Sequence, residues 1–272
     1  MRLIVEPFLC SLFALFLTAC QPDTAPSSTP APPAVAATAP APMVVPTTTP
    51  LPTRAPSATP TARTLRLPPP AQATEIANGP STTNKVALTF DAGIRSPHIV
   101  PILDQLKAAN VRSTMFLTGW WADQHPEIVA RMVAEGHEMG NHSYSHPNFT
   151  EISNAAIREE VERGNAAIAR HGGTPTKPWF RPPSGDRDAR VNRTIGELGY
   201  YSIYWSLDTL DWMEDVTAQQ VLERTISRTT PGAIIVAHLT SPQTAQVLSE
   251  MIRRLRERGF ELVLVSELLS EP

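Results

Sequence analysis

The sequence has almost no cysteine, no surplus of positive charge and no apolar run long enough to cross a bilayer. Its two cysteines, Cys10 and Cys20, lie within the first twenty residues, which excludes a disulfide or a thiolate zinc site in the rest of the chain. The net charge is −3, so the sequence has no excess of Lys and Arg with which to neutralise nucleic-acid phosphates. No nucleic-acid partner is therefore predicted. The apolar run at residues 8–19 has 12 residues, whereas a membrane-spanning helix needs roughly 20.

Proline is abundant and unevenly placed. Sixteen of the 28 prolines lie between residues 22 and 80, in a stretch of Pro, Thr, Ala and Ser with few large apolar side chains. Such a segment cannot bury enough surface to offset the entropy of ordering it. We predict a disordered linker over residues 20–80, a semi-stiff spacer with a reach on the order of 100 Å. The remaining residues, 81–272, have the size of one folded domain.

The first residues have the pattern of an export signal. Arg2 precedes the apolar run, whose length is that of a signal-peptide core. The run ends in Leu17-Thr18-Ala19-Cys20, which resembles the cleavage box of bacterial lipoproteins. We predict a signal peptide over residues 1–19 and lipidation of Cys20, which would anchor the protein to the outer face of a bacterial membrane. The alternative is ordinary secretory cleavage near Ala19.

From residue 85 onward, short apolar runs alternate with segments of helical periodicity that carry capping signals. We predict strands at residues 85–90, 113–117, 137–141, 178–181, 200–207, 233–237 and 261–265, and helices at 96–109, 126–135, 153–171, 189–198, 217–228 and 241–258. This order predicts an α/β fold, either a parallel sheet or a (β/α) barrel, with about seven strands. The helices lack sustained heptads, so a monomer is predicted.

Ionisable side chains follow five of the predicted strands. In parallel α/β folds the carboxyl ends of the strands share one face, so we expect these side chains to meet in one cleft. In chain order they are Asp91, the pair His142 and His146, Arg181, the pair Asp208 and Asp211, and His238.

Two of these positions suggest specific chemistry. His142 and His146 are four residues apart, so a helical turn would place both imidazoles on one side, where they could share a metal ion. Histidines at this spacing also occur as surface or capping residues. His238 follows a fully apolar strand, a position that suits either acid–base chemistry or a buried core histidine. Asp211 suits either a role in the site or capping of the next helix.

Five motifs, in this order, resemble the polysaccharide deacetylases, the NodB-type carbohydrate esterases. They are TFDAG at residues 89–93, NHSYSH at 141–146, RPPSG at 181–185, DTLDW at 208–212 and IIVAH at 234–238. The resemblance extends over residues 85 to about 268. It implies a distorted (β/α) barrel and removal of acetyl groups from acetylated glycans with a divalent metal, commonly Zn²⁺ and alternatively Co²⁺.

The resemblance also implies a role for each matching residue. His142 and His146 would bind the metal, and Asp91 would be the general base that activates the attacking water. His238 would be the general acid, oriented by Asp211, and Arg181 would fix the base. The backbone N–H near Ser184 would bind the oxyanion. Trp212 and Val236 would form the apolar wall of the acetyl-methyl pocket.

The first motif departs from the family pattern at one position. The family usually carries a second aspartate after Asp91, and this aspartate is the third metal ligand; here the position is Ala92. A methyl group cannot bind a cation, so weaker metal binding is expected, because catalytic zinc usually has three protein ligands. The retained base, acid and orienting residues favour an active enzyme.

The preferred interpretation is therefore a metal-dependent hydrolase that removes acetyl groups from N-acetylated extracellular glycans. Peptidoglycan and chitin-like N-acetylglucosamine polymers, met in the periplasm or cell wall, are the expected substrates. One alternative is a glycan-binding lipoprotein that kept the cleft and lost turnover with the missing carboxylate. A second is an O-acetyl esterase that acts on xylan.

Overall fold

The computed structural model describes residues 67–70, 75–93 and 97–270. Within these residues, eight strands form one sheet in which every recorded pairing is parallel. Their order is β5-β4-β3-β2-β1-β7-β6, and β8 pairs with the start of β1. The strands are β1 (Lys85–Ala92), β2 (Thr114–Leu117), β3 (Glu138–Asn141), β4 (Trp179–Phe180), β5 (Tyr201–Ser202), β6 (Leu207–Asp208), β7 (Ile234–His238) and β8 (Glu261–Leu262).

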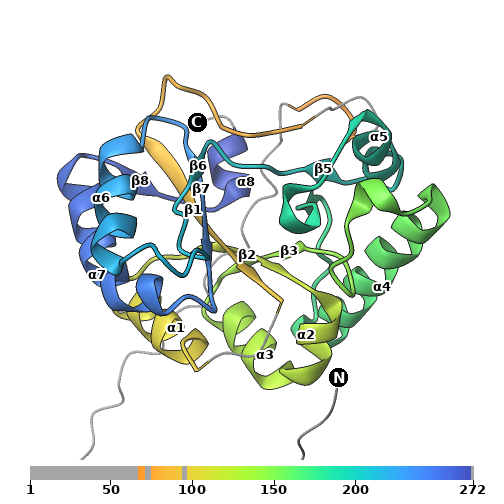
Figure 1. The fold of residues 1–272 in the computed structure, drawn as a ribbon, viewed down its shortest axis with the longest axis horizontal. Coiled ribbons are helices and arrows are strands. Elements are labelled where there is room, and N and C mark those ends of the chain that lie inside the picture. The colour runs from red at the N-terminus through yellow and green to blue at the C-terminus, as the bar shows by residue number, and fades with distance from the viewer. Residues whose placement is uncertain (1–66, 71–74, 94–96, 271–272) are drawn as a thin grey trace, which may run out of the picture. The chain divides into compact units, whose positions relative to one another are not determined.

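Helices surround the strands (Figure 1). They are α1 (Ile99–Ala108), α2 (Gly119–Gln124), α3 (Pro126–Ala134), α4 (Asn154–Gly172), α5 (Ala189–Glu197), α6 (Ala218–Arg228), α7 (Pro242–Glu257) and α8 (Val265–Leu269). The first residues of three predicted helices, Ser153, Thr217 and Ser241, are N-caps, because each side chain accepts a backbone N–H of the first turn. The helix predicted from residue 96 begins instead at Ile99, and Ser96 lies outside the described residues.

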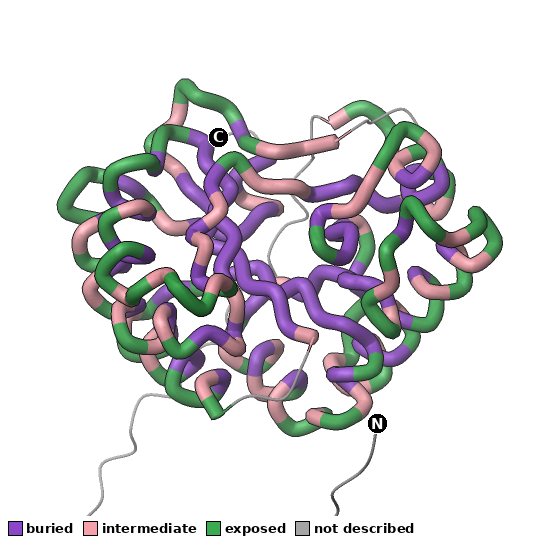
Figure 2. Tube along the Cα trace, viewed as in Figure 1, coloured by how far each residue is buried: buried purple, intermediate pink, exposed green. Residues whose placement is uncertain are grey.

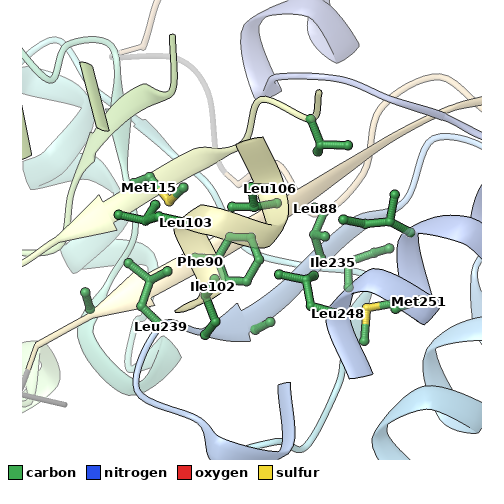
Figure 3. Packing of buried hydrophobic residues seen from close by; sticks show 14 of the residues in the cluster. Leu88, Phe90, Ile102, Leu103, Leu106, Met115, Ile235, Leu239, Leu248 and Met251 are labelled. Atoms are coloured by element: carbon green, nitrogen blue, oxygen red, sulfur yellow. The ribbon is translucent and has the colours of Figure 1, made fainter. Parts of the chain in front are cut away.

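Alternation along β1 separates two cores. Leu88 and Phe90 pack with α1 and α7 in an apolar layer between the sheet and its helices (Figure 3). Ala87 belongs to a second apolar cluster, and the Thr89 hydroxyl meets a buried arginine. Because successive side chains of a strand point to opposite faces, Asp91 lies on the same face as Ala87 and Thr89. Figure 2 shows the buried strands inside helices that expose their outer faces.

The predicted fifth strand over residues 200–207 is wrong in one respect, because it is two short strands at opposite edges of the sheet. β5 ends at Ser202 and β6 begins at Leu207. Residues 203–206 can span at most about 18 Å, whereas the edges of a flat seven-stranded sheet would be about 29 Å apart. The sheet is therefore curled, which confirms the distorted-barrel expectation. The break follows from hydrogen bonding, since the carbonyls of Ile203 and Tyr204 accept from the Arg181 side chain.

The end of the predicted linker also needs correction, because residues 75–80 pair with the domain. The Ile76 N–H donates to Ser202 O (2.9 Å), and the Tyr204 N–H donates to Ile76 O (2.8 Å). The Gly79 N–H donates to Gly232 O (2.7 Å). This segment pairs with the end of edge strand β5 on one side and with the residues just before β7 on the other, and supplies backbone partners to both. Composition alone could not reveal this pairing, and residues 1–66 and 71–74 lie outside the described residues.

Among the residues that the structure describes, no helix has the length and apolar character needed to span a membrane.

Candidate active site

A cleft of about 730 Å³ lies at the carboxyl ends of the strands. Predicted site residues from five separate segments line it, so these segments converge on one cleft. Two other predicted residues, Arg181 and Asp211, are buried behind its surface. The lining includes Asp91, His142, His146, Ser184, Asp208, Trp212, Val236 and His238.

Asp91 and Arg181 form a buried ion pair at the base of the cleft. Arg181 Nη1 donates to Asp91 Oδ1 at 2.6 Å, and Nη2 donates to the Thr89 hydroxyl at 2.9 Å. The guanidinium also lies 4.0 Å from the centre of the Phe116 ring. Burial raises the pKa of Asp91, but its interactions with Arg181 above all, and with His142 and His238, outweigh burial, so the pKa lies below its usual 3.8. The carboxylate is therefore ionised at neutral pH and held in one orientation.

His142 and His146 stand beside this carboxylate. The His142 Nδ1–H donates to the carbonyl of Arg181 at 2.7 Å, which leaves Nε2 as the free lone pair, 3.6 Å from Asp91 Oδ2. Burial lowers the pKa of His142 to about 4, so the ring is neutral at physiological pH. The His146 ring lies 4.9 Å away, nearly perpendicular. His146 and Ser143 both have positive φ angles, and the Ser143 hydroxyl accepts the His146 N–H, so the loop itself brings the rings together.

These residues partly fit a divalent metal. A neutral imidazole whose far nitrogen donates to a carbonyl is the usual arrangement of a histidine ligand. However, no cluster of three His, Cys, Asp or Glu side chains able to hold a metal occurs in the described part of the chain. Ala92, at the position of the expected third ligand, is buried in the apolar layer against the helices. The described side chains thus offer two neighbouring imidazoles, of which His142 has this arrangement, and no carboxylate at position 92.

His238 and Asp211 form a second pair, contributed by segments on the other side of β1. The His238 Nδ1–H donates to Asp211 Oδ1 at 2.7 Å, and the His238 backbone N–H donates to Oδ2 at 2.9 Å. The Thr244 hydroxyl also donates to Asp211, which is almost fully buried. Burial lowers the pKa of His238, but the hydrogen bond and charge of Asp211 outweigh it and raise the pKa above 6.5. A protonated His238 therefore persists to higher pH than a free histidine.

The apolar residues predicted for the site differ in exposure. Val236 is almost completely buried, whereas Trp212 has 59% of its surface exposed and its indole N–H reaches Asp208 at 3.3 Å. Ser184 is exposed at the cleft and has a φ of 53°. Sequence reasoning missed Trp120 and Trp205, which also line the cleft. Trp120 follows the second predicted strand by three residues, so a search for side chains after each strand that included aromatic residues would have found it. Trp205 could not be found in this way, because it lies within the predicted fifth strand.

Sequence comparisons agree with this arrangement. The sequence model of the polysaccharide deacetylase family matches residues 78–203. The chain is 30% identical over 195 residues to a peptidoglycan-N-acetylmuramic acid deacetylase of Bacillus subtilis, covering 71% of this chain and 74% of the relative. It is 34% identical over 190 residues to a peptidoglycan-N-acetylglucosamine deacetylase of Bacillus cereus, covering 68% of each.

Structural comparison leads to the same class. A family 4 carbohydrate esterase pseudoenzyme of Bacillus anthracis superposes with a TM-score of 0.70 at 31% identity, covering 75% of this chain and 70% of that one. A mutant of that pseudoenzyme is described as having restored activity. The fold and the cleft thus place the protein among the carbohydrate esterases whose parallel sheet is curled into a distorted barrel. The chain belongs to the polysaccharide deacetylase family, which confirms the resemblance noted in the sequence.

Proposed function

We propose that this protein is a metal-dependent deacetylase that removes acetyl groups from N-acetylated glycans outside the cytoplasm. The observation that carries the proposal is the pairing of opposite acid–base groups in one cleft. Arg181 lowers the pKa of Asp91 and so favours its carboxylate, whereas Asp211 raises the pKa of His238 and so favours its protonated form. Groups whose surroundings push their pKa values apart are suited to act as base and acid in one reaction.

Peptidoglycan is the proposed substrate class. Two relatives that each match about 70% of the chain are named for deacetylation of peptidoglycan, one at N-acetylglucosamine and one at N-acetylmuramic acid. Both sugars carry an acetamido group, and hydrolysis of that amide needs a base for the water and an acid for the leaving amine. The open cleft with exposed Trp120 and Trp212 is suited to a sugar chain.

In the proposed mechanism, Asp91 accepts a proton from the attacking water. Arg181 holds the carboxylate in place and keeps it ionised through the 2.6 Å ion pair. His238 donates a proton to the leaving amine, and Asp211 holds the ring by Nδ1 so that Nε2 carries that proton. The backbone N–H of Ser184 stabilises the oxyanion. Trp212 and Val236 border the acetyl methyl.

His142 and His146 are the proposed metal ligands. When bound, a divalent ion would polarise the acetyl carbonyl and make water a better nucleophile near neutral pH. The Arg181 carbonyl orients His142 for this role through the 2.7 Å bond to Nδ1. Zn²⁺ is the proposed ion, with Co²⁺ as the alternative. Because position 92 supplies no carboxylate, we propose weak metal binding.

The second candidate is a glycan-binding protein without turnover. Two observations favour it: the alanine at position 92, and the similarity to an esterase described as a pseudoenzyme. Under this alternative the cleft still binds the glycan, but the reaction is lost with the third ligand.

Acetate release by the full chain separates the two functions. After metal stripping, release is measured from N-acetylglucosamine oligomers, peptidoglycan and O-acetylated xylan, with and without added Zn²⁺ or Co²⁺. The proposal expects release from the N-acetylated glycans only with metal, and loss of this release in His238→Ala. Release from xylan alone would identify an O-acetyl esterase. Binding of the oligomers without release under any metal would establish the binding protein.

Export and anchoring complete the proposal. Residues 1–19 would serve as a signal peptide, Cys20 would carry the lipid, and residues up to about 74 would tether the domain to the outer face of the membrane. All of these features fall in the stretch before residue 75, of which the structure describes residues 67–70 alone. The support is the sequence pattern together with a substrate class found outside the cytoplasm.

A further inference from the structure

Four side chains form a continuous stack that begins in the segment 75–80, just after the linker, and ends at the cleft. Glu75 makes a two-point ion pair with Arg187, with Oε2 accepting from Nε at 2.6 Å and Oε1 from Nη2 at 3.1 Å. The Arg187 guanidinium lies 3.4 Å from the centre of the Tyr204 ring. Tyr204 in turn stacks on Trp205 at 3.9 Å and 18°, and Trp205 lines the cleft. We call these four residues the Glu75–Trp205 stack.

The stack also contacts the turn that carries Ser184. Arg187 Nη1 donates to the Gly185 carbonyl at 3.0 Å. A Cβ added at Gly185 would lie 2.8 Å from atoms of both Tyr204 and Trp205, and the residue has a φ of +66°. Only glycine fits this approach without a shift. The turn Pro183–Gly185 is therefore held by two contacts at Gly185. Arg187 binds the carbonyl of this residue, and the rings of Tyr204 and Trp205 pack against its backbone.

Arg187 satisfies three partners at once, which sets it apart from an ordinary surface cation. Its side chain is 24% exposed and that of Glu75 is 29% exposed, so the pair is partly shielded from water. A planar guanidinium can present two N–H groups to a carboxylate, a third to a carbonyl, and its face to an aromatic ring; an ammonium group cannot. Glu75 lies outside the family match, which begins at residue 78. The segment that precedes the family match thus anchors Arg187, and the stack built on Arg187 reaches the cleft at Trp205.

We propose that Arg187, anchored by Glu75, is a positioning residue that holds the Ser184 backbone N–H and Trp205 in place within the cleft. The inference rests on the proposed function, in which that N–H stabilises the oxyanion. Because the negative charge develops only in the transition state, loss of this positioning is expected to lower kcat more than it raises KM.

The test compares kcat and KM for acetate release from an N-acetylglucosamine oligomer, using the full chain with added Zn²⁺. Arg187→Met is expected to lower kcat roughly tenfold or more, since small misplacements of reacting groups have effects of this size, with KM changed less than about threefold. Arg187→Lys and Glu75→Gln are expected to fall between Arg187→Met and wild type. The matched control is Arg158→Met, because Arg158 pairs with Glu197 and does not line the cleft.

Two kinetic outcomes would overturn the inference. One is an Arg187→Met enzyme with unchanged kcat and a raised KM, which would make Arg187 a direct substrate contact. The other is a loss of kcat no larger than that of Arg158→Met, or one accounted for by a smaller folded fraction in thermal unfolding.

A second measurement keeps this test separate from the proposed function. The fluorescence of Trp205 is obtained as the difference between each protein and its Trp205→Phe counterpart. Arg187→Met is expected to shift or quench this difference signal while Arg158→Met leaves it unchanged. If the wild-type chain releases no acetate, the proposed function fails, and the fluorescence still decides whether Arg187 sets the position of Trp205. An unchanged signal in Arg187→Met would overturn the inference.

Discussion

Asp91, which is buried, and His238, which is partly buried, show how two titratable groups in one cleft acquire opposite pKa shifts. Burial disfavours the charged form of both groups. Arg181 overrides burial at Asp91 and favours the carboxylate, whereas Asp211 overrides it at His238 and favours the imidazolium. Arg181 thus favours the ionised base and Asp211 favours the protonated acid that the proposed roles require, and each group depends on one partner.

Asp211→Asn is expected to reduce kcat roughly 10²- to 10⁴-fold, because general acid catalysis has this range, and to change the pH profile. The raised pKa of His238 means that the protonated acid is present at low pH and lost as pH rises through that pKa. Without the carboxylate, burial remains and lowers the pKa, so the alkaline limb of kcat/KM should move to lower pH. A profile with an unmoved alkaline limb would contradict the assignment of His238 as the acid.

Ala92→Asp tests the missing ligand. Ala92 is 1% exposed within the apolar layer, and a Cβ added at the next residue, Gly93, would lie 3.9 Å from His146. Without metal, the new carboxylate is expected to lower the free energy of unfolding by about 1–3 kcal/mol, because it is buried without a partner. With Zn²⁺, affinity should rise roughly tenfold or more and restore stability.

The measurement is zinc titration by calorimetry, together with denaturant unfolding of stripped and zinc-loaded protein. Ala92→Asn is the control, since the amide has the same size and is a poor zinc ligand. Equal zinc affinity in Ala92→Asp and wild type would show that position 92 does not reach the metal.

Helix α4 positions the histidine loop through a glycine. A Cβ on Gly164 would lie 2.5 Å from Asn141 Oδ1 and 2.7 Å from the Ser143 carbonyl. Asn141 joins the two elements, because its Nδ2 donates to Val161 O and its Oδ1 accepts the Ser143 N–H. The backbone of α4 thus packs directly on the loop that carries His142.

Gly164→Ala is expected to lower the free energy of unfolding by about 1–3 kcal/mol, the cost of overpacking, and to weaken zinc binding as the loop moves. Gly172→Ala is the matched control in the same helix, where the nearest atoms are Val133 and Val129 methyl carbons at 3.3 and 3.4 Å. Denaturant unfolding and zinc calorimetry measure both effects. If Gly164→Ala loses stability and keeps zinc affinity, α4 does not set the geometry of the loop.

The boundaries of the elements were predictable where local signals mark them. Ser153, Thr217 and Ser241 precede α4, α6 and α7 as expected, because a cap depends on neighbours three residues away. The division between β5 and β6 was not predictable from local sequence. It depends on hydrogen bonds from the side chain of Arg181, some twenty residues upstream, to the carbonyls of Ile203 and Tyr204.

The full chain, from its N-terminus to the domain, is proposed to be tethered through Cys20. Cys20→Ser is expected to move the protein from the membrane fraction to the soluble fraction of the cells that produce it, because the lipid supplies the anchor. Cys10→Ser is the matched control, since Cys10 lies inside the apolar run and would be removed with the signal peptide. Fractionation with immunodetection measures both. A Cys20→Ser protein that stays with the membrane would contradict the anchor.

The strand–helix alternation, the helix caps and the polar residues at strand ends could all be inferred from the amino-acid order, because they depend on propensity, periodicity and neighbours a few residues apart. Those signals were enough to name Asp91, His142, His146 and His238 as members of one cleft. The family resemblance implied the curl of the sheet, but the tertiary structure alone revealed the pairing of residues 75–80 and the stack from Glu75 to Trp205. These features join residues far apart in the chain, such as Gly79 and Gly232, which are 153 positions apart, and only the folded backbone determines which distant groups satisfy one another.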